Sequence, residues 1–119
     1  MTNPFRDQEK FMRACDQKIN SFNEEQYNLY KSLIDEEVAE LHEATTQEDE
    51  LDALVDILVV TIGAIHSAGF NGEGAWKEVM STNFAKIDSL TGKVRKREDG
   101  KVLKPANWRA PNLTPYIKK

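Results

Sequence analysis

The chain has 119 residues, of which 39% are hydrophobic and 30% are charged, and its formal net charge is −4. This length suits a single domain. The single cysteine excludes an intramolecular disulfide, and the N-terminal segment carries acids and lacks the apolar stretch of a signal peptide. The longest apolar run, residues 57–65, is far shorter than the roughly 20 residues that span a bilayer. We therefore expect a soluble, cytoplasmic protein with no membrane partner.

Charge is distributed unevenly along the chain. Residues 1–90 contain 7 Lys or Arg and 18 Asp or Glu, whereas residues 91–119 contain 9 and 2. An acidic body with a basic tail suits two ligands of opposite sign, such as a metal ion and a phosphate. The same pattern also arises if the tail is only the counter-charge of the body. We predict one domain, with a helical body over residues 1–90 and an extended basic tail over residues 91–119 that packs on it.

Hydrophobic residues recur at helical spacing in four segments, which we predict to be helices. Their expected spans are residues 7–20, 24–44, 48–68 and 73–87. The expected caps are Asn23 for the second helix and a threonine of the 45–46 pair for the third, with Gly69 as its stop. Cys15 is expected in the core, and the fourth helix is expected to bury its apolar residues Trp76, Val79, Met80, Phe84 and Ile87.

The segment after the fourth helix has a different character. Asp99-Gly100 separates two short basic and apolar stretches and predicts a hairpin. Three prolines, Pro105, Pro111 and Pro115, then keep the chain out of helix. We expect this tail to be extended.

The third predicted helix indicates how the protein assembles. From Ile57 to Ile65 it is apolar nearly all round, and such a helix must be covered on several sides. A chain of this size can barely supply that cover. The sequence thus predicts an all-α fold of the four-helix-bundle type that forms a homodimer or homotetramer.

Acidic residues gather at helical spacing where the second and third helices are also apolar. On the second helix Glu37 falls inside the apolar arc, Glu40 falls at its edge and Glu36 leans toward solvent. On the third helix three acids share one face: Asp49, Asp52 and Asp56. A single inward glutamate usually snorkels or pairs with a lysine. A cluster is best explained by a divalent cation, and carboxylates without His or Cys suit Mg²⁺ or Mn²⁺, which favours phosphate chemistry.

These motifs resemble a known enzyme superfamily. EEVAEL at 36–41 followed by DELDALVDILVVTIGAIHSAG at 49–69 resembles the MazG-like all-α nucleoside triphosphate pyrophosphohydrolases, which include phosphoribosyl-ATP pyrophosphohydrolase. Their signature is a Glu-Glu-x-x-Glu helix followed by a Glu-x-x-Asp helix. The later stretches, STNFAKIDSLTGK at 81–93 and REDGKVLKPANWRAPNL at 97–113, resemble a HisE-like branch often met in bacteriophages.

The resemblance implies a role for each matched acid. Glu37, Glu40 and Asp56 would ligate the metal, and Glu36 would ligate it or orient water, so that Glu36 and Glu37 are the candidate catalytic residues. The glutamate of the family's Glu-x-x-Asp motif is replaced by Ala53 in the third predicted helix. Asp52 is the expected substitute. An alternative register uses Asp49 and Asp52 as the pair.

The basic tail and the end of the fourth helix supply candidate phosphate ligands, because Lys and Arg neutralise triphosphate charge. The predicted substrate-binding residues are Asn83, Lys86, Arg97, Lys101, Lys104 and Asn107. Trp108 is expected to pack the tail rather than to bind a base.

The predicted function is Mg²⁺-dependent hydrolysis of a nucleoside triphosphate to the monophosphate and pyrophosphate, with a deoxynucleoside triphosphate as the favoured substrate. The base, the sugar, the attacked phosphorus and the number of metal ions are not fixed by the sequence. One rival is a catalytically inactive helical oligomer that acts as an interaction or nucleotide-binding module. Another is nucleic-acid binding by the tail, against which the acidic body argues.

Overall fold

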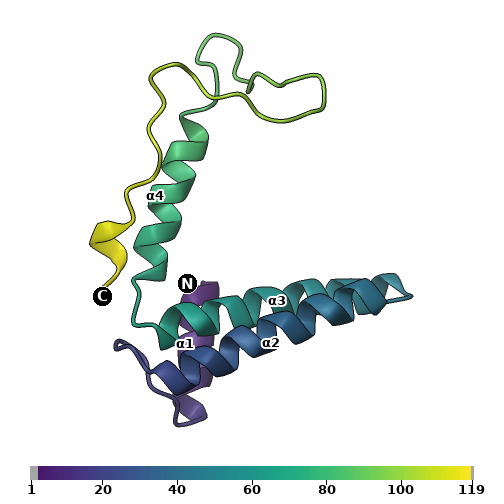
Figure 1. The fold of residues 1–119 in the computed structure, drawn as a ribbon, viewed down its shortest axis with the longest axis vertical. Coiled ribbons are helices and arrows are strands. Elements are labelled where there is room, and N and C mark those ends of the chain that lie inside the picture. The colour runs from purple at the N-terminus through teal and green to yellow at the C-terminus, as the bar shows by residue number, and fades with distance from the viewer. Residues whose placement is uncertain (1–2, 119) are drawn as a thin grey trace. The chain divides into compact units, whose positions relative to one another are not determined.

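Within residues 3–118, the part of the chain that the computed structural model describes, there are four α-helices and a short 3-10 helix. In chain order they are α1 (Pro4–Ala14), α2 (Glu24–Glu43), α3 (Gln47–Ser67), α4 (Gly72–Phe84) and the 3-10 helix η1 (Thr114–Tyr116). The same residues contain two isolated antiparallel bridges but no strand. The predicted all-α fold class is confirmed (Figure 1).

The chain forms two compact units. One comprises residues 3–72 together with 116–118, and the other comprises residues 73–115. The boundary between them falls at the start of α4. The division expected from charge, a body over 1–90 with a tail over 91–119 packed on it, stays a prediction.

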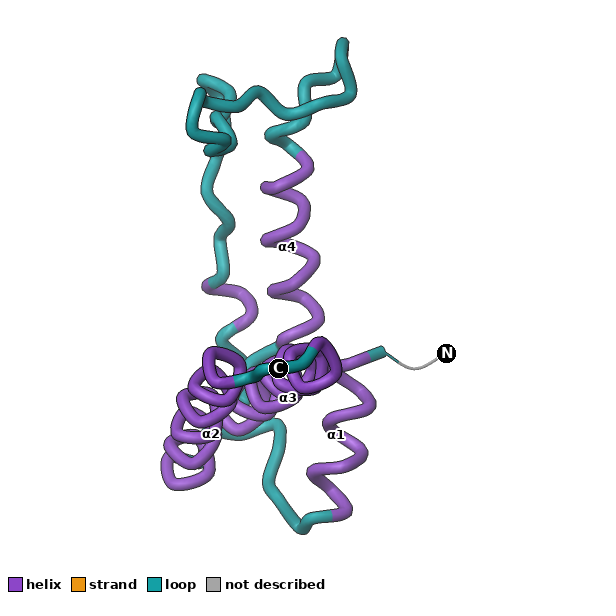
Figure 2. Tube along the Cα trace, turned by 90° about the vertical axis from the view of Figure 1, so that its right-hand side faces the viewer, coloured by secondary structure: helices purple, strands orange, loops and turns teal. Residues whose placement is uncertain are grey.

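The first unit is built on the hairpin of α2 and α3, which lie side by side and antiparallel (Figures 1 and 2). Each helix starts at a side-chain cap, as the sequence predicts. Asn23 Oδ1 accepts a hydrogen bond from the Gln26 amide at 3.0 Å, and Thr46 Oγ1 accepts one from the Asp49 amide at 3.1 Å. Gly69, with φ of 76°, ends α3 in the left-handed conformation that favours glycine.

The predicted span of α1 was wrong at both ends. The helix begins three residues early because Asn3 Oδ1 accepts a hydrogen bond from the Arg6 amide and Pro4 occupies the first turn. It ends at Ala14, and Asp16 turns the chain with φ of 58°. Cys15 therefore caps the helix and is exposed, not part of the core as its spacing suggested.

The core of this unit lies where α1 and α2 pack against α3. Met12, Tyr30, Val60 and Ala64 are buried together. Gly63 makes the approach of Tyr30 possible, because a Cβ at this position would lie less than 3.0 Å from the Tyr30 ring. Close packing thus fixes how α2 sits on α3 and which of their acidic residues face each other.

The second unit consists of α4 and the chain that returns along it (Figure 2). Trp108 Nε1 donates to the Thr82 carbonyl at 2.7 Å, and the Asn112 amide donates to Glu78 Oε2 at 2.8 Å. These contacts run antiparallel to the helix, and Trp108 packs the tail as expected.

The prediction for α4 needs two corrections. The helix ends at Phe84, three residues before the predicted end. Trp76 and Phe84 are 59% and 60% exposed, and Ile87 is 42% exposed, so they are not buried as predicted. One helix and one extended segment cannot cover the whole circumference of an apolar helix.

The predicted hairpin around Asp99-Gly100 is present as a short antiparallel pairing. Lys96 bridges to Val102, and the Arg97 amide donates to the Lys101 carbonyl at 2.8 Å. A second bridge joins Ile87 to Val94. Together the two bridges fold residues 87–102 back toward the end of α4.

No single helix within residues 3–118 is long and apolar enough to cross a membrane. Taken as a pair, α3 and α4 pass that test by length and composition alone, as the core helices of many proteins without a membrane segment do.

Candidate functional site

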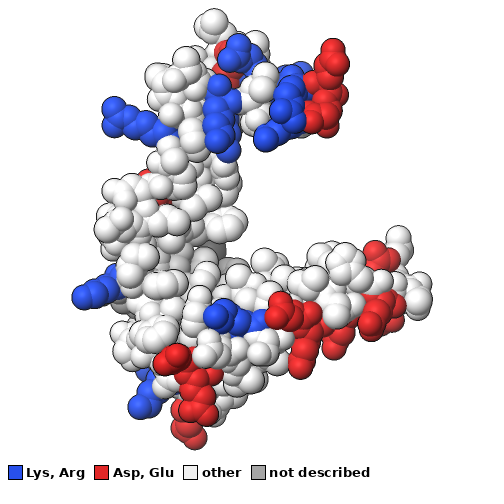
Figure 3. All heavy atoms as spheres, viewed as in Figure 1, with Lys and Arg blue, Asp and Glu red and all other residues white. Residues whose placement is uncertain are grey.

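The acidic residues of the hairpin form the first candidate site. In the first unit, red acidic atoms gather along α2 and α3 (Figure 3). Glu37 is half-buried, and its Oε2 has no contact with solvent and accepts no hydrogen bond from any described residue. A buried carboxylate oxygen without a donor is costly unless the group is protonated or binds a cation. This supports the expectation that Glu37 points inward.

Neighbouring acids perturb Glu37. Burial raises the pKa of its carboxyl, and so do the interaction with the Glu40 carboxyl and the negative charges of Glu40, Asp56 and Asp52. Both mechanisms disfavour the ionised form. The structure therefore brings Glu37 and Glu40 of α2 close to Asp52 and Asp56 of α3, the four residues predicted to bind metal.

Asp56 shows the same effect from the other helix. Its pKa is raised by burial and then by the charges of Asp52 and Glu40. Glu36 is exposed and is not among the charges that act on Glu37 or Asp56. The predicted metal ligands are thus neighbours, whereas Glu36 faces solvent beside them.

A small pocket of about 230 Å³ lies next to this cluster, where α2 ends and α3 begins. It is lined by Glu40, Glu43, Ala44, Asp49, Asp52 and Ala53. Asp49 and Asp52, the pair of the alternative register, both line this pocket. Asp52 also belongs to the preferred pair, so each register places at least one ligand here. Glu43 was not among the predicted metal ligands. It follows Glu40 at the same i, i+3 spacing that places Glu40 on one face with Glu37.

Ala53 occupies the position of the family's glutamate and is 3% exposed. In the described part of the chain, no three His, Cys, Asp or Glu side chains converge tightly enough to form a ready metal cage. Mg²⁺ in phosphate-processing enzymes commonly uses one or two carboxylates plus water and substrate phosphates. The all-carboxylate donor set and the unpartnered Glu37 oxygen fit such an ion.

The second unit holds the predicted phosphate ligands. Lys86 Nζ donates to Asn83 Oδ1 at 3.0 Å and lies 5.2 Å from the centre of the Trp108 ring. Lys104 Nζ lies 4.5 Å from the same ring centre. Three of the six predicted residues, Asn83, Lys86 and Lys104, are thus brought together around one tryptophan.

A pocket of about 370 Å³ adjoins this group. Its polar lining includes Lys86, Asn107, Asp88 and Arg95. Asp88 is engaged locally, since its Oδ1 accepts hydrogen bonds from the Leu90 and Thr91 amides at 2.7 and 3.3 Å. Arg95 was not among the predicted residues, because only the bridges of the tail place it here.

The other two predicted tail cations lie on the hairpin. Arg97 donates to Asp99 at 2.6 and 3.1 Å, which raises the pKa of the arginine and lowers that of the aspartate. Lys101 is exposed, and its amide donates to Asp99 Oδ1 at 3.1 Å. Neither residue lines the pocket beside Lys86.

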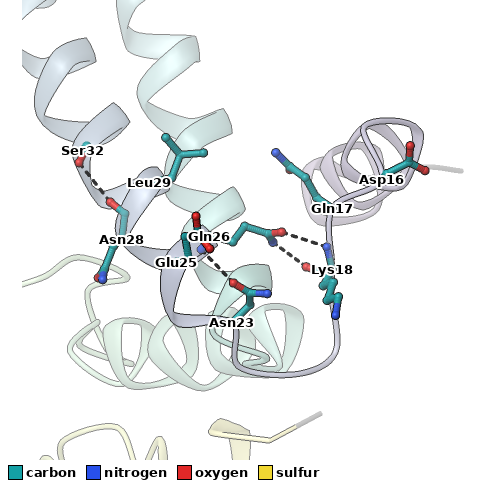
Figure 4. Close-up of a pocket in the computed structure, with 9 residues that line it drawn as sticks. All are labelled: Asp16, Gln17, Lys18, Asn23, Glu25, Gln26, Asn28, Leu29 and Ser32. Carbon is teal, nitrogen blue, oxygen red and sulfur yellow. Dashed lines mark hydrogen bonds between the residues drawn. The ribbon is translucent and has the colours of Figure 1, made fainter.

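A further pocket, of about 600 Å³, lies at the connection between α1 and α2, away from the acidic cluster (Figure 4). Gln26 organises its wall by accepting from the Lys18 amide at 3.0 Å and donating to the Lys18 carbonyl at 2.6 Å. These bonds substitute for backbone pairing and anchor the connection to α2. None of the predicted site residues lines this pocket.

A family model described as phosphoribosyl-ATP pyrophosphohydrolase matches residues 5–83, well over half of the chain. The chain belongs to the phosphoribosyl-ATP pyrophosphohydrolase family. This family is part of the MazG-like and HisE-like all-α pyrophosphohydrolase superfamily, as the motifs indicated, and membership identifies a pyrophosphohydrolase-type enzyme. No curated protein sequence matches the chain.

The extent of the phosphoribosyl-ATP pyrophosphohydrolase match separates the two candidate sites. It includes α2, α3 and nearly all of α1 and α4, and so it covers every acid of the hairpin cluster. It ends at Asn83, before Lys86 and the whole basic tail. The match therefore assigns no role to the tail residues.

Proposed function

We propose that this protein hydrolyses a nucleoside triphosphate, with a deoxynucleotide the favoured class, to the monophosphate and pyrophosphate in a Mg²⁺-dependent reaction. The observation that supports it most is the mutual perturbation of the acids on α2 and α3, centred on Glu37. Carboxylates held together at the cost of raised pKa values are typical of functional sites. Family membership supplies the reaction class.

The proposed metal ligands are Glu37, Glu40, Asp52 and Asp56. When bound, Mg²⁺, or Mn²⁺ in its place, would neutralise phosphate charge and favour attack on phosphorus. The unpartnered Oε2 of Glu37 would gain the positive partner that it lacks. Asp49 remains the alternative to Asp52, since both line the same small pocket.

Two glutamates are candidates for handling the attacking water. Glu36 is exposed and can hold a water molecule at the rim of the cluster. Glu37 lies inside the cluster, where a carboxylate can accept a proton from a water molecule beside the metal. We propose that one of them orients this water and takes its proton, and that the negative leaving group departs as pyrophosphate.

The phosphate-binding residues of this proposal all lie in the 73–115 unit. Lys86 and Lys104 have the strongest support, because both ammonium groups lie at one tryptophan and neither is paired with a carboxylate among residues 3–118. Asn83 orients Lys86, and Asn107 lines the adjoining pocket. Arg97 and Lys101 stay predictions, with Arg97 already paired to Asp99.

We also propose that a second copy of this chain covers an exposed face of α3. It is not the whole predicted run from Ile57 to Ile65, because the chain itself buries residues 60 and 62–64 of that run. The exposed face consists of Leu51, Leu54, Val55 and Leu58, which are 48% to 63% exposed and follow i, i+3, i+4, i+7 spacing. No other helix of the first unit covers them. A contiguous apolar face of this kind is typical of a subunit interface, and it supports a homodimer or homotetramer.

A nucleotide panel tests the proposed reaction. Purified protein with Mg²⁺ is incubated with canonical and damaged nucleoside triphosphates, and the products are identified chromatographically. Pyrophosphate and a monophosphate are expected as the first products. Orthophosphate with a diphosphate left behind would rule this chemistry out. The expected place of action is the cytoplasm, where nucleoside triphosphates are made and used.

One specific observation favours the rival function of a catalytically inactive nucleotide-binding module. Ala53 occupies the position of the family's glutamate and is buried, and an alanine side chain can neither bind a metal nor transfer a proton. Under this alternative the protein would bind nucleotides without releasing pyrophosphate, and Ala53→Glu would be the variant that gains activity.

A further inference from the structure

The 73–115 unit contains a pocket whose cations are not neutralised. Lys86 and Arg95 line it, and Lys104 lies beside Lys86 at the same tryptophan ring. Within residues 3–118, none of these three cations forms a salt bridge with a carboxylate. Unpaired cations that converge on one pocket favour an anionic ligand.

Trp108 holds two of these cations in place. Its indole N–H is fixed to the Thr82 carbonyl at 2.7 Å, so the ring is anchored to α4. Both ammonium groups approach that ring by cation–π contact and lie at most about 10 Å apart, the sum of their distances from its centre. Two positive charges near one ring raise the local positive potential, and an anion bound beside them would be stabilised by both.

Arg95 is brought to the same place by the backbone of the tail. The bridge from Ile87 to Val94 lies immediately before it, and its own carbonyl accepts from the Leu103 amide at 2.8 Å. The single carboxylate in the lining, Asp88, already accepts two amide hydrogen bonds. The guanidinium offers several donors suited to phosphate oxygens.

We propose that Lys86, Arg95 and Lys104 form a binding site for a pyrophosphate-class anion, and that Trp108 is the positioning residue that holds the two lysines. The inference rests on the proposed function only in naming pyrophosphate, its leaving group, as the anion. The site is a local group of three cations: Lys86 and Arg95 line a pocket of about 370 Å³, and Lys104 lies at the ring that Lys86 also contacts. A nucleic-acid backbone would instead require a basic stripe along the surface.

The test is calorimetric titration of the full chain with inorganic pyrophosphate, in EDTA and at about 0.15 M salt, where long-range charge effects are screened. Arg95→Gln and Lys104→Gln should each weaken binding about tenfold or more, the effect expected for a lost charge-assisted contact. Lys96→Gln is the matched control, because Lys96 is exposed, adjacent to Arg95 and absent from the pocket lining. It should change the affinity less than threefold.

The positioning role has its own readout. In a Trp76→Phe background, Trp108 is the single tryptophan left of the two in the chain. Pyrophosphate bound by the two lysines beside the ring should change its fluorescence. Trp108→Leu should weaken binding although all three cations remain, and Trp108→Phe, which keeps an aromatic face, should restore part of the affinity.

Three results would overturn the proposal. They are no binding of pyrophosphate by the wild-type chain, an equal loss of affinity in Lys96→Gln, and tighter binding of a single-stranded oligonucleotide than of pyrophosphate at the same salt. A nucleoside triphosphate is titrated in parallel. If pyrophosphate displaces the nucleoside triphosphate, the site binds the polyphosphate of a nucleotide. If the two bind simultaneously, the site binds the free anion. Either result supports the site.

The outcome is separable from that of the proposed function. A chain that binds pyrophosphate as described but releases none from any triphosphate would refute the hydrolysis alone. A chain that hydrolyses triphosphates while Arg95→Gln and Lys104→Gln leave pyrophosphate binding intact would refute the anion site alone.

Discussion

Asp56 on α3 lies close enough to Glu37 on α2 for its negative charge to raise the pKa of the Glu37 carboxyl. The two residues belong to different helices, and the packing of Tyr30 against Gly63 fixes how those helices meet. Like charges held together by packing destabilise the folded state when both are ionised. A bound cation would reverse that effect, and this reversal can be measured.

The first prediction concerns metal binding. Mg²⁺ or Mn²⁺ should raise the melting temperature of the wild-type chain, because a ligand that binds only the folded state stabilises it. Glu37→Gln and Asp56→Asn should each abolish this rise and keep the helical circular dichroism spectrum. Glu25→Gln is the control, since Glu25 is exposed near the other end of α2, and it should respond like the wild type. A full metal response in both site variants would remove them from the site.

The second prediction concerns pH in the absence of metal. The folded-state pKa values of Glu37 and Asp56 are raised, so the folded chain holds these protons more tightly than the unfolded chain. Their contribution to stability is therefore fully present below the ordinary values of 4.5 and 3.8 and is lost as pH rises through the folded-state values.

Glu37→Gln isolates this effect, because it cannot ionise at position 37. With EDTA present, the melting temperature of Glu37→Gln minus that of the wild type should be larger at about pH 8 than at about pH 4.5. A difference that stays constant over this range would show that the ionised Glu37 costs the fold nothing.

The third prediction concerns assembly. Light scattering should report a dimer or larger for the wild type, not a monomer of 13.6 kDa. Leu58→Glu places a charge in the exposed apolar face of α3 and should shift the population toward monomer. Leu90→Glu is the control, because Leu90 is 95% exposed and lies in the tail. If both variants assemble like the wild type, another surface joins the subunits.

The fourth prediction separates the tail lysines in catalysis. Lys104 contacts Trp108, whereas Lys101 lies exposed on the hairpin. Lys104→Ala should lower kcat/KM for the triphosphate by about 10- to 150-fold, the kinetic equivalent of about 1.5–3 kcal/mol. Lys101→Ala reports whether the hairpin also contacts substrate, as the sequence suggested. A lower melting temperature with unchanged kinetics in both would mean that the tail is only counter-charge for the body.

The fifth prediction tests the packing that aligns the acidic residues. Gly63→Ala should destabilise the chain by about 1–3 kcal/mol, because the added methyl group overlaps the Tyr30 ring. In a Tyr30→Leu background the same substitution should cost clearly less, which a double-mutant cycle from chemical denaturation would reveal. Equal costs in the two backgrounds would contradict the contact.

The sequence by itself determined the helices and the acids that they present. Caps at Asn23 and Thr46 and a stop at Gly69 are local signals, since each depends on a side chain or a backbone angle within a few residues. Helical spacing also placed Glu37 on the inward face without knowledge of α3. The resemblance of these motifs to a pyrophosphohydrolase superfamily was confirmed by the family match.

Only the tertiary structure decided which distant residues meet. The contact between Gly63 and Tyr30 sets the pairing of α2 with α3, and helical spacing within one segment contains no information about the partner segment. The exposure of Cys15 follows from the early end of α1. Arg95 reaches the pocket that Lys86 lines through two bridges, Ile87 to Val94 and Lys96 to Val102, and its place was decided by that backbone pairing rather than by any periodic pattern.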